Sequence, residues 1–141
     1  MELNILRADP AGNITVFVLD PVEKAQRAAI AEKIMAIPAL KAEQVGYACA
    51  AEDDVDGHME MMGGEFCGNA TRAYGMYIAQ QKGGLSSVRL RVSGCDHAVT
   101  AQVDLKSGTA RAEMPCPRSV KRVTVNGHEG TLVDLTGIAH F

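Results

Sequence analysis

The sequence is organised around residues 63–82, which read GGEFCGNATRAYGMYIAQQK. Two glycines and a short loop precede a run that predicts a helix over 68–81. The helix is apolar on nearly every side until Gln80, and a helix of that kind is buried. We therefore expect the rest of the chain to cover this helix. Its apolar positions are Ala70, Ala73, Tyr74, Met76, Tyr77, Ile78 and Ala79.

Strand-like segments flank this helix on both sides in the sequence. They are short and are separated by turns that contain glycine, proline or asparagine. The predicted strands are 2–7, 14–19, 44–50, 58–62, 87–92, 98–105, 109–114, 120–125 and 131–135. Since these strands cluster rather than alternate regularly with helices, the pattern predicts an α+β fold, with a curved, antiparallel-rich sheet or barrel around the central buried helix.

Another helix is predicted over 21–36, where Pro21 marks the start and Pro38 lies beyond the end. The charged residues of this segment, Arg27 among them, are expected to face water. The apolar face is expected to consist of Ala25, Ala28, Ala29, Ile30, Ile34 and Met35.

Length and composition indicate a single domain over 1–141. Hydrophobic residues make up 47% and charged residues 22% of the chain, an ordinary balance for a soluble protein. The net charge is −3 and the basic residues are scattered, which disfavours nucleic-acid binding because phosphates need a concentrated basic surface. The sequence has no apolar run of membrane-spanning length and no signal-peptide pattern, so we expect a cytoplasmic protein that does not enter a membrane.

The cysteines and histidines do not have the spacing of a zinc or redox motif. In a reducing cytoplasm the cysteines are not expected to form disulfides. We therefore predict no metal site. The residues concerned are Cys49, Cys67, Cys95, Cys116, His58, His97, His128 and His140.

Cys67 is the candidate for chemistry, because it stands where the buried helix begins. Free N–H groups and the helix dipole stabilise negative charge there, so the thiolate should form readily. The backbone N–H groups of Gly68 and Asn69 can hold a carboxylate. A thiolate beside a carboxylate suits removal of a proton next to that carboxylate. The alternative is structural: glycines that form the turn and a small cysteine that packs in the core.

Four segments resemble the diaminopimelate epimerase superfamily. FCGNATR at 66–72 is similar to its Cys-Gly-Asn-x-x-Arg signature, and AGN at 11–13 resembles its N-terminal Gly-Asn segment. EQVGY at 43–47 and VSGC at 92–95 look still more like the histidine-racemase branch, which serves opine metallophore synthesis of the staphylopine type. The resemblance implies one half of a fold with two pseudo-symmetric halves, each a curved sheet or barrel around a central helix.

The resemblance also implies the chemistry. Such enzymes use neither pyridoxal phosphate nor a metal, so no cofactor is expected. One thiolate removes the α-proton of the amino acid, and a thiol on the opposite face returns one. By this carry-over Cys67 is one acid/base and Asn13 faces the substrate. The backbone groups of Gly68 and Asn69 would bind the α-carboxylate.

The second thiol of the family lies in the second half, in a glycine-rich loop at a helix start. Neither cysteine that follows Cys67 matches such a loop. Cys95 lies in strand-rich sequence, and Cys116 stands between two prolines. We therefore expect this chain to be the N-terminal half of a two-domain racemase or epimerase, with half an active site. It would need a complementary C-terminal half or a second chain, and a homodimer is one such arrangement. The other class of function is a non-catalytic binding domain or stable fragment that keeps only the fold.

Histidine is the favoured substrate, with diaminopimelate as the alternative. Diaminopimelate epimerases typically carry an Asn-Ala-Asp-Gly-Ser-like stretch before the cysteine loop, where this chain has EMMGG at 60–64. Glu43 is a candidate reader of the side chain, since a carboxylate accepts a hydrogen bond from an imidazole N–H; otherwise it is a solvated residue before a strand. Arg72, at the arginine position of the signature, is expected to pair with an acidic residue.

Overall fold

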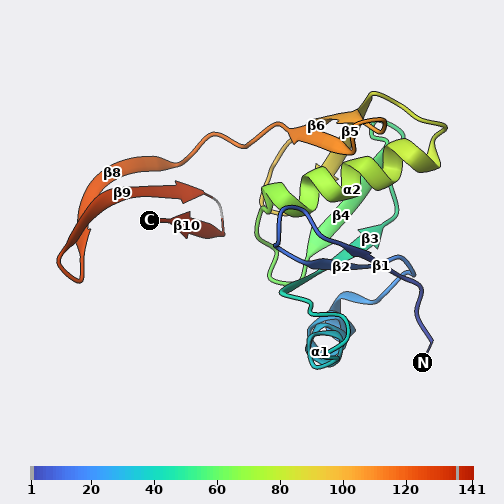
Figure 1. Ribbon diagram of the computed structural model, residues 1–141, viewed down its shortest axis with the longest axis horizontal. Coiled ribbons are helices and arrows are strands. Elements are labelled where there is room, and N and C mark those ends of the chain that lie inside the picture. Colours follow the sequence, from blue (N-terminus) through green and yellow to red (C-terminus); the bar gives the residue numbers. More distant parts are fainter. Residues whose placement is uncertain (1, 136) are drawn as a thin grey trace.

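The computed structural model of the protein describes residues 2–135 and 137–141, and in that part of the chain it has two helices and ten strands (Figure 1). No helix of the described part is both long and apolar enough to cross a membrane. The elements are β1 (Ile5–Ala8), β2 (Thr15–Val18), α1 (Lys24–Met35), β3 (Gln44–Cys49), β4 (Gly57–Met61), α2 (Gly68–Gln81), β5 (Ser87–Val92), β6 (Val99–Asp104), β7 (Thr109–Ala112), β8 (Ser119–Val125), β9 (His128–Leu135) and β10 (Ile138–His140).

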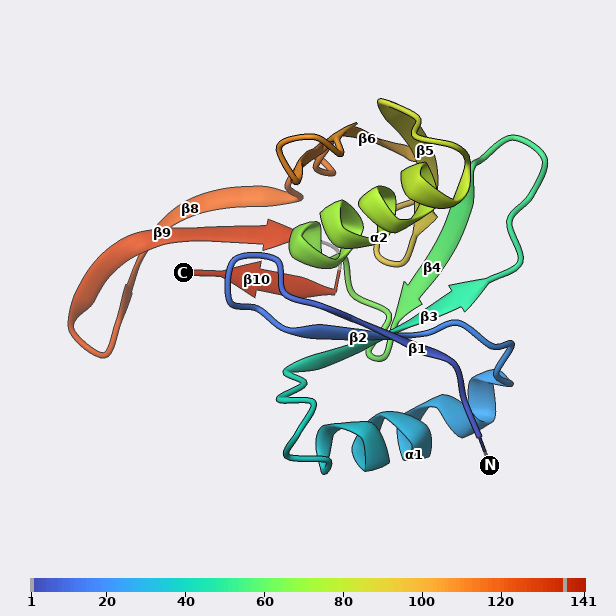
Figure 2. The ribbon, with the colours of Figure 1, turned by 45° about the vertical axis from the view of Figure 1, so that its right-hand side comes forward.

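Strands β1 to β7 form one sheet in sequence order. Most neighbours pair antiparallel, but β2–β3 and β4–β5 are parallel because α1 and α2 provide the crossover connections. The sheet curls around α2, which packs on β4 to β7, while α1 lies against β3 on the other face (Figure 2). The predicted α+β class, with a curved, largely antiparallel sheet around a central helix, is confirmed.

Alternation along the strands places the larger core between the sheet and α2. Every second residue of β5 and β6 is buried toward the helix, as at Val88, Leu90 and Ala101. The helix approaches this surface closely at Gly75, where an added Cβ would lie 2.7 Å from the Cβ of Ala101. This contact accounts for a glycine in the middle of a helix, where glycine is otherwise unfavourable.

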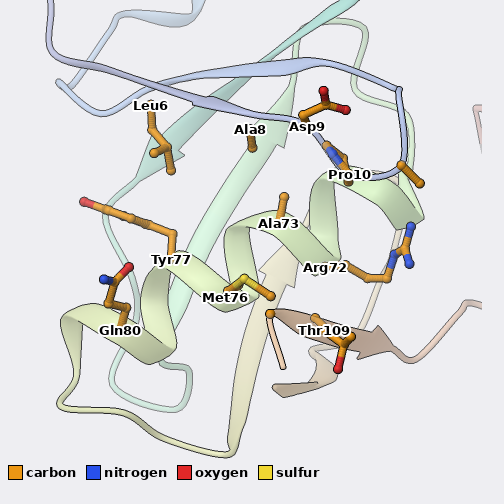
Figure 3. Close-up of a pocket in the computed structure, with 13 residues that line it drawn as sticks. Leu6, Ala8, Asp9, Pro10, Arg72, Ala73, Met76, Tyr77, Gln80 and Thr109 are labelled. Atoms are coloured by element: carbon orange, nitrogen blue, oxygen red, sulfur yellow. The ribbon is translucent and has the colours of Figure 1, made fainter. Parts of the chain in front are cut away.

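One face of α2 is less covered than the sequence predicts. Ala73, Met76 and Tyr77 are only half-buried, and they line a cavity of about 500 Å³ with residues of β1 and β7 (Figure 3). Both strands are edges of the seven-stranded sheet, so the sheet does not close over this face. The prediction of a helix buried nearly all round is therefore wrong here, because the apolar pattern of a helix cannot reveal where a sheet ends.

Helix α1 buries a narrower apolar face than predicted. Ile30, Ala31 and Ile34 are buried against β2 and β3, whereas Ala25, Ala28, Ala29 and Met35 are exposed. Arg27, expected to face water, instead lies over the ring of Tyr47, with its guanidinium carbon 5.2 Å from the ring centroid. It also forms a salt bridge with Glu60. The guanidinium therefore belongs to the contact between α1 and the sheet.

Strands β8, β9 and β10 form a separate antiparallel sheet that extends from the main body (Figure 1). The sequence analysis predicts that the strands over 120–125 and 131–135 wrap around α2, and this prediction is wrong. Strand β10 is not predicted at all. Two prolines, Pro115 and Pro117, follow β7. Because proline cannot donate to a strand ladder, the chain leaves the first sheet at this place.

Candidate active site

Cys67 is the N-cap residue of α2, with extended backbone angles (φ −129°, ψ 109°). Its Sγ atom lies 3.4 Å from the backbone nitrogen of Ala70, whose N–H points at the sulfur. Its carbonyl oxygen accepts hydrogen bonds from the backbone N–H (2.9 Å) and the hydroxyl (2.8 Å) of Thr71. The half-buried thiol is therefore held at the positive end of the helix.

Gln44, the first residue of β3, contacts the thiol directly. Its Nε2 atom lies 3.2 Å and its Oε1 atom 3.5 Å from the Sγ of Cys67. The amide can thus donate to a thiolate or accept from a thiol. Nε2 also lies 2.8 Å from the Oδ1 of Asn13 and 2.7 Å from the hydroxyl oxygen of Thr15. Because the amide has two hydrogens, it donates to two of these three acceptors at a time.

Sequence reasoning missed Gln44. The signal that could have found it is a polar residue at the head of an otherwise apolar strand, within the segment whose first residue, Glu43, was singled out. Its contact with Cys67 depends on the parallel pairing of β2 with β3, in which Thr15 lies opposite Gln44.

Asn13 connects the predicted site residues. Its Oδ1 accepts from the side chains of Gln44 and, at 3.4 Å, Asn69. Its Nδ2 donates to the carboxylate of Glu43 at 3.0 Å. Asn69 in turn accepts a hydrogen bond from Arg72. A continuous polar network therefore runs from Glu43, on the exposed rim, to the first turn of α2.

A cleft of about 530 Å³ opens in front of the thiol. It contains four of the five predicted site residues: Asn13, Cys67, Gly68 and Asn69. Glu43 is exposed and reaches the cleft through Asn13 rather than lining it. The remaining lining residues are Gln44, Glu65, Phe66, Arg72, Ala112, Met114, Leu135, Ile138 and His140.

The cleft is equipped to hold an anion. Within the described residues, the backbone N–H groups of Gly68 and Asn69, in the first turn of α2, donate no hydrogen bond. Arg72 faces the same cleft, and within the described chain it forms no salt bridge, so the expectation of an acidic partner is wrong. Two open N–H groups, a helix dipole and a guanidinium together favour a carboxylate.

The other thiols have different surroundings. Cys49 lies beside Arg27, and burial raises the pKa of its thiol. Cys95, Asp96 and His97 lie in the loop between β5 and β6, where their potential ligand atoms lie within 4.8 Å of one another. The sequence spacing does not predict this group. Asp96 and His97 are exposed and bond to each other at 2.8 Å. Cys116 is exposed.

Cys67 is expected to be the most reactive thiol, by about 10-fold over Cys116, because N–H groups at the helix start can stabilise its thiolate. Titration of the folded protein with a small alkylating reagent, followed by mass mapping of the adducts, measures the four rates. Unfolded protein serves as the control, since all four thiols should then react at similar rates. If Cys49, Cys95 or Cys116 reacts as fast as Cys67 in the folded protein, the thiol is not activated.

The curled sheet around α2, with a cysteine at the start of that helix, defines one half of a diaminopimelate epimerase-like fold. The chain belongs to the family described as the histidine racemase CntK N-terminal domain, which it matches over residues 2–141.

Curated relatives agree with this assignment. The chain is 32% identical to a histidine racemase of Fusobacterium nucleatum subsp. nucleatum, over 99% of this chain and 53% of the relative. It is also 32% identical to a histidine racemase of Staphylococcus aureus, over 84% of this chain and 44% of the relative. The chain thus spans about half the length of the curated relatives it matches.

Proposed function

We propose that this chain is the N-terminal half of a histidine racemase in which Cys67 is one of two proton-transfer groups. The observation that carries the proposal is the position of its Sγ atom, at the N-terminus of α2, beside Gln44 and in the cleft. The names of its relatives support the same reaction. The protein would then be an isomerase.

The proposed step is a 1,1-proton transfer. The Cys67 thiolate takes the α-proton, the C–H bond breaks, and its electron pair stays on the α-carbon, delocalised into the carboxylate. A group on the opposite face donates a proton to that carbon, which inverts it. Gln44 suits both protonation states of the sulfur, because its amide has a donor and an acceptor within 3.5 Å of it.

The transition state gathers negative charge on the substrate carboxylate. The N–H groups of Gly68 and Asn69 are proposed to bind this group, with Arg72 nearby and Asn13 facing the substrate. Donors that are fixed before the reaction stabilise such charge without having to reorganise. This chemistry uses side chains and backbone of the protein alone, in keeping with the expectation that no cofactor is needed.

The second proton-transfer group is proposed to lie in a complementary half, on the same polypeptide or on a second chain. The relatives are about twice as long as this chain, which supports a partner half. A cytoplasmic location and a role in metallophore synthesis are further parts of the proposal. They follow from the sequence resemblance, and the free cysteines fit a reducing compartment.

Substrate choice tests the proposal most directly. In the protein joined to its second half, histidine should racemise efficiently, and diaminopimelate should turn over at least about 10²-fold more slowly. The reason is that EMMGG at 60–64 stands in place of the Asn-Ala-Asp-Gly-Ser-like stretch that would hold the distal amino-acid group. Chiral chromatography of the products, together with solvent-deuterium incorporation at the α-carbon, measures both. Efficient turnover of diaminopimelate would contradict the assignment of substrate.

Glu43→Ala should lower histidine turnover about 10-fold, because the carboxylate is proposed to accept a hydrogen bond from the substrate imidazole. The same carboxylate accepts a hydrogen bond from the Nδ2 of Asn13 at 3.0 Å and so holds that side chain in place. Glu43→Gln is the matched variant, because its amide oxygen can still accept from Asn13 but carries no charge. An unchanged rate in Glu43→Ala would remove Glu43 from the proposed site.

A further inference from the structure

The side chain of Ser93, just after β5, joins the two ends of the turn that leads to Cys67. Its Oγ atom accepts a hydrogen bond from the backbone N–H of Met61, the last residue of β4, at 2.8 Å. The same hydroxyl donates to the backbone oxygen of Glu65 at 2.7 Å. One hydroxyl therefore links Met61, at the start of this turn, to Glu65, at its end.

Gly94 lies directly on the backbone of the same turn. Its φ angle of +71° is in the region that favours glycine. An added Cβ would lie 2.2 Å from the backbone nitrogen of Phe66 and 2.8 Å from the carbonyl carbon of Glu65. Since both are backbone atoms, they could give way only if the turn itself moved.

The turn is also held from its other sides. The side chain of Phe66 is buried, with 2% of its surface exposed, in the core under α2. At Gly137, between β9 and β10, an added Cβ would lie 3.2 Å from the Cα of Glu65. Residues 65–66 are thus enclosed between two loops and the core, and Cys67 is the next residue along the chain. The position of the Cys67 sulfur therefore depends on the position of the backbone at residues 65–66.

We propose that Ser93 and Gly94 are positioning residues for Cys67, which act through the backbone of residues 65–66 and do not touch the substrate. The part of this proposal that concerns the reaction rests on the proposed racemase function. Proton transfer tolerates little displacement, because an error of about 1 Å in a reacting group can cost about 10²-fold in rate. The hydroxyl of Ser93 fixes the turn, and Gly94 allows the closest approach.

Ser93→Ala tests the proposal, with Ser93→Thr as the variant that keeps the hydroxyl. In the isolated chain, the ratio of Cys67 to Cys116 alkylation rates should fall about 3- to 10-fold in Ser93→Ala and recover in Ser93→Thr. Ser107→Ala is the matched control: it removes a hydroxyl that bonds to Thr109 at 2.8 Å in the turn before β7. That variant should keep the wild-type ratio.

The second readout uses the protein joined to its second half. Ser93→Ala should lower kcat about 10-fold and leave KM within about twofold, since no substrate contact is lost. An alkylation ratio equal to that of wild type, or a Ser93→Thr ratio as low as that of Ser93→Ala, overturns the proposal. If the wild-type protein racemises no amino acid, the proposed function fails, while the alkylation ratio still decides whether Ser93 positions the thiol.

Discussion

Cys67→Ser is expected to lower histidine racemisation by at least about 10³-fold in the protein joined to its second half. A serine hydroxyl is a far weaker base than a thiolate at neutral pH, and a positioned acid–base group contributes about 10²–10⁴-fold to rate. The substitution is nearly isosteric, and the serine oxygen can still accept from the N–H of Ala70 as an N-cap. The fold should therefore survive, and the loss should be in kcat.

The measurement is the rate at which D-histidine forms from L-histidine, followed by chiral chromatography. Cys116→Ser is the matched control, because it removes an exposed thiol that does not line the cleft, and it should keep the wild-type rate. Activity of Cys67→Ser above about a tenth of wild type would show that another group removes the α-proton.

The 141-residue chain by itself is expected not to racemise amino acids. Inversion of a carbon needs one group on each face, and the proposed site supplies only Cys67. Loss of one fixed donor to the carboxylate typically lowers the rate about 10²–10³-fold. Without the proposed second half, the chain lacks the second proton-transfer group as well, so the loss in rate should be larger still. Solvent-deuterium incorporation into histidine, with and without the second half, measures the difference. The isolated chain should stay at the background rate, and the joined protein should not.

The same preparation must be folded for that result to count. Selective alkylation of Cys67 over Cys116 in the isolated chain provides this control. Steady turnover by the purified chain, abolished in Cys67→Ser, would contradict the prediction and would mean that two copies assemble a complete site. The rate per chain would then rise with protein concentration, which separates this outcome from a contaminating enzyme.

The central part of the fold could be predicted because its signals are local. The predicted bounds of α2, 68–81, agree with the structure, since a nearly continuous apolar run follows a glycine-rich loop there. Strand β5 also agrees, because alternation over 87–92 is unbroken. Agreement is poorer for β1, which runs from Ile5 to Ala8 rather than from residue 2 to residue 7. An edge strand has few partners that fix its ends.

The candidate site was predictable to the extent that it lies along one segment. Cys67, Gly68 and Asn69 are neighbours in sequence, and the start of a helix orients them together. Gln44 was missed because it lies 23 residues from Cys67 and reaches it only through the register of β3 beside β2. The sequence prediction named its neighbour Glu43, which lies just before β3 and joins the same network through Asn13.

Sequence alone therefore determined the helix that organises the sheet, the place of Cys67 at its N-terminus and the family resemblance, because periodicity and loop composition act over a few residues. Tertiary structure decided the rest: the contact of Gln44, the placement of Arg27 over Tyr47, the open face of α2 and the separate sheet of β8–β10. Each of these depends on strand pairing or packing between distant segments. The residue pattern of a single segment does not indicate which distant segment it pairs with or packs against.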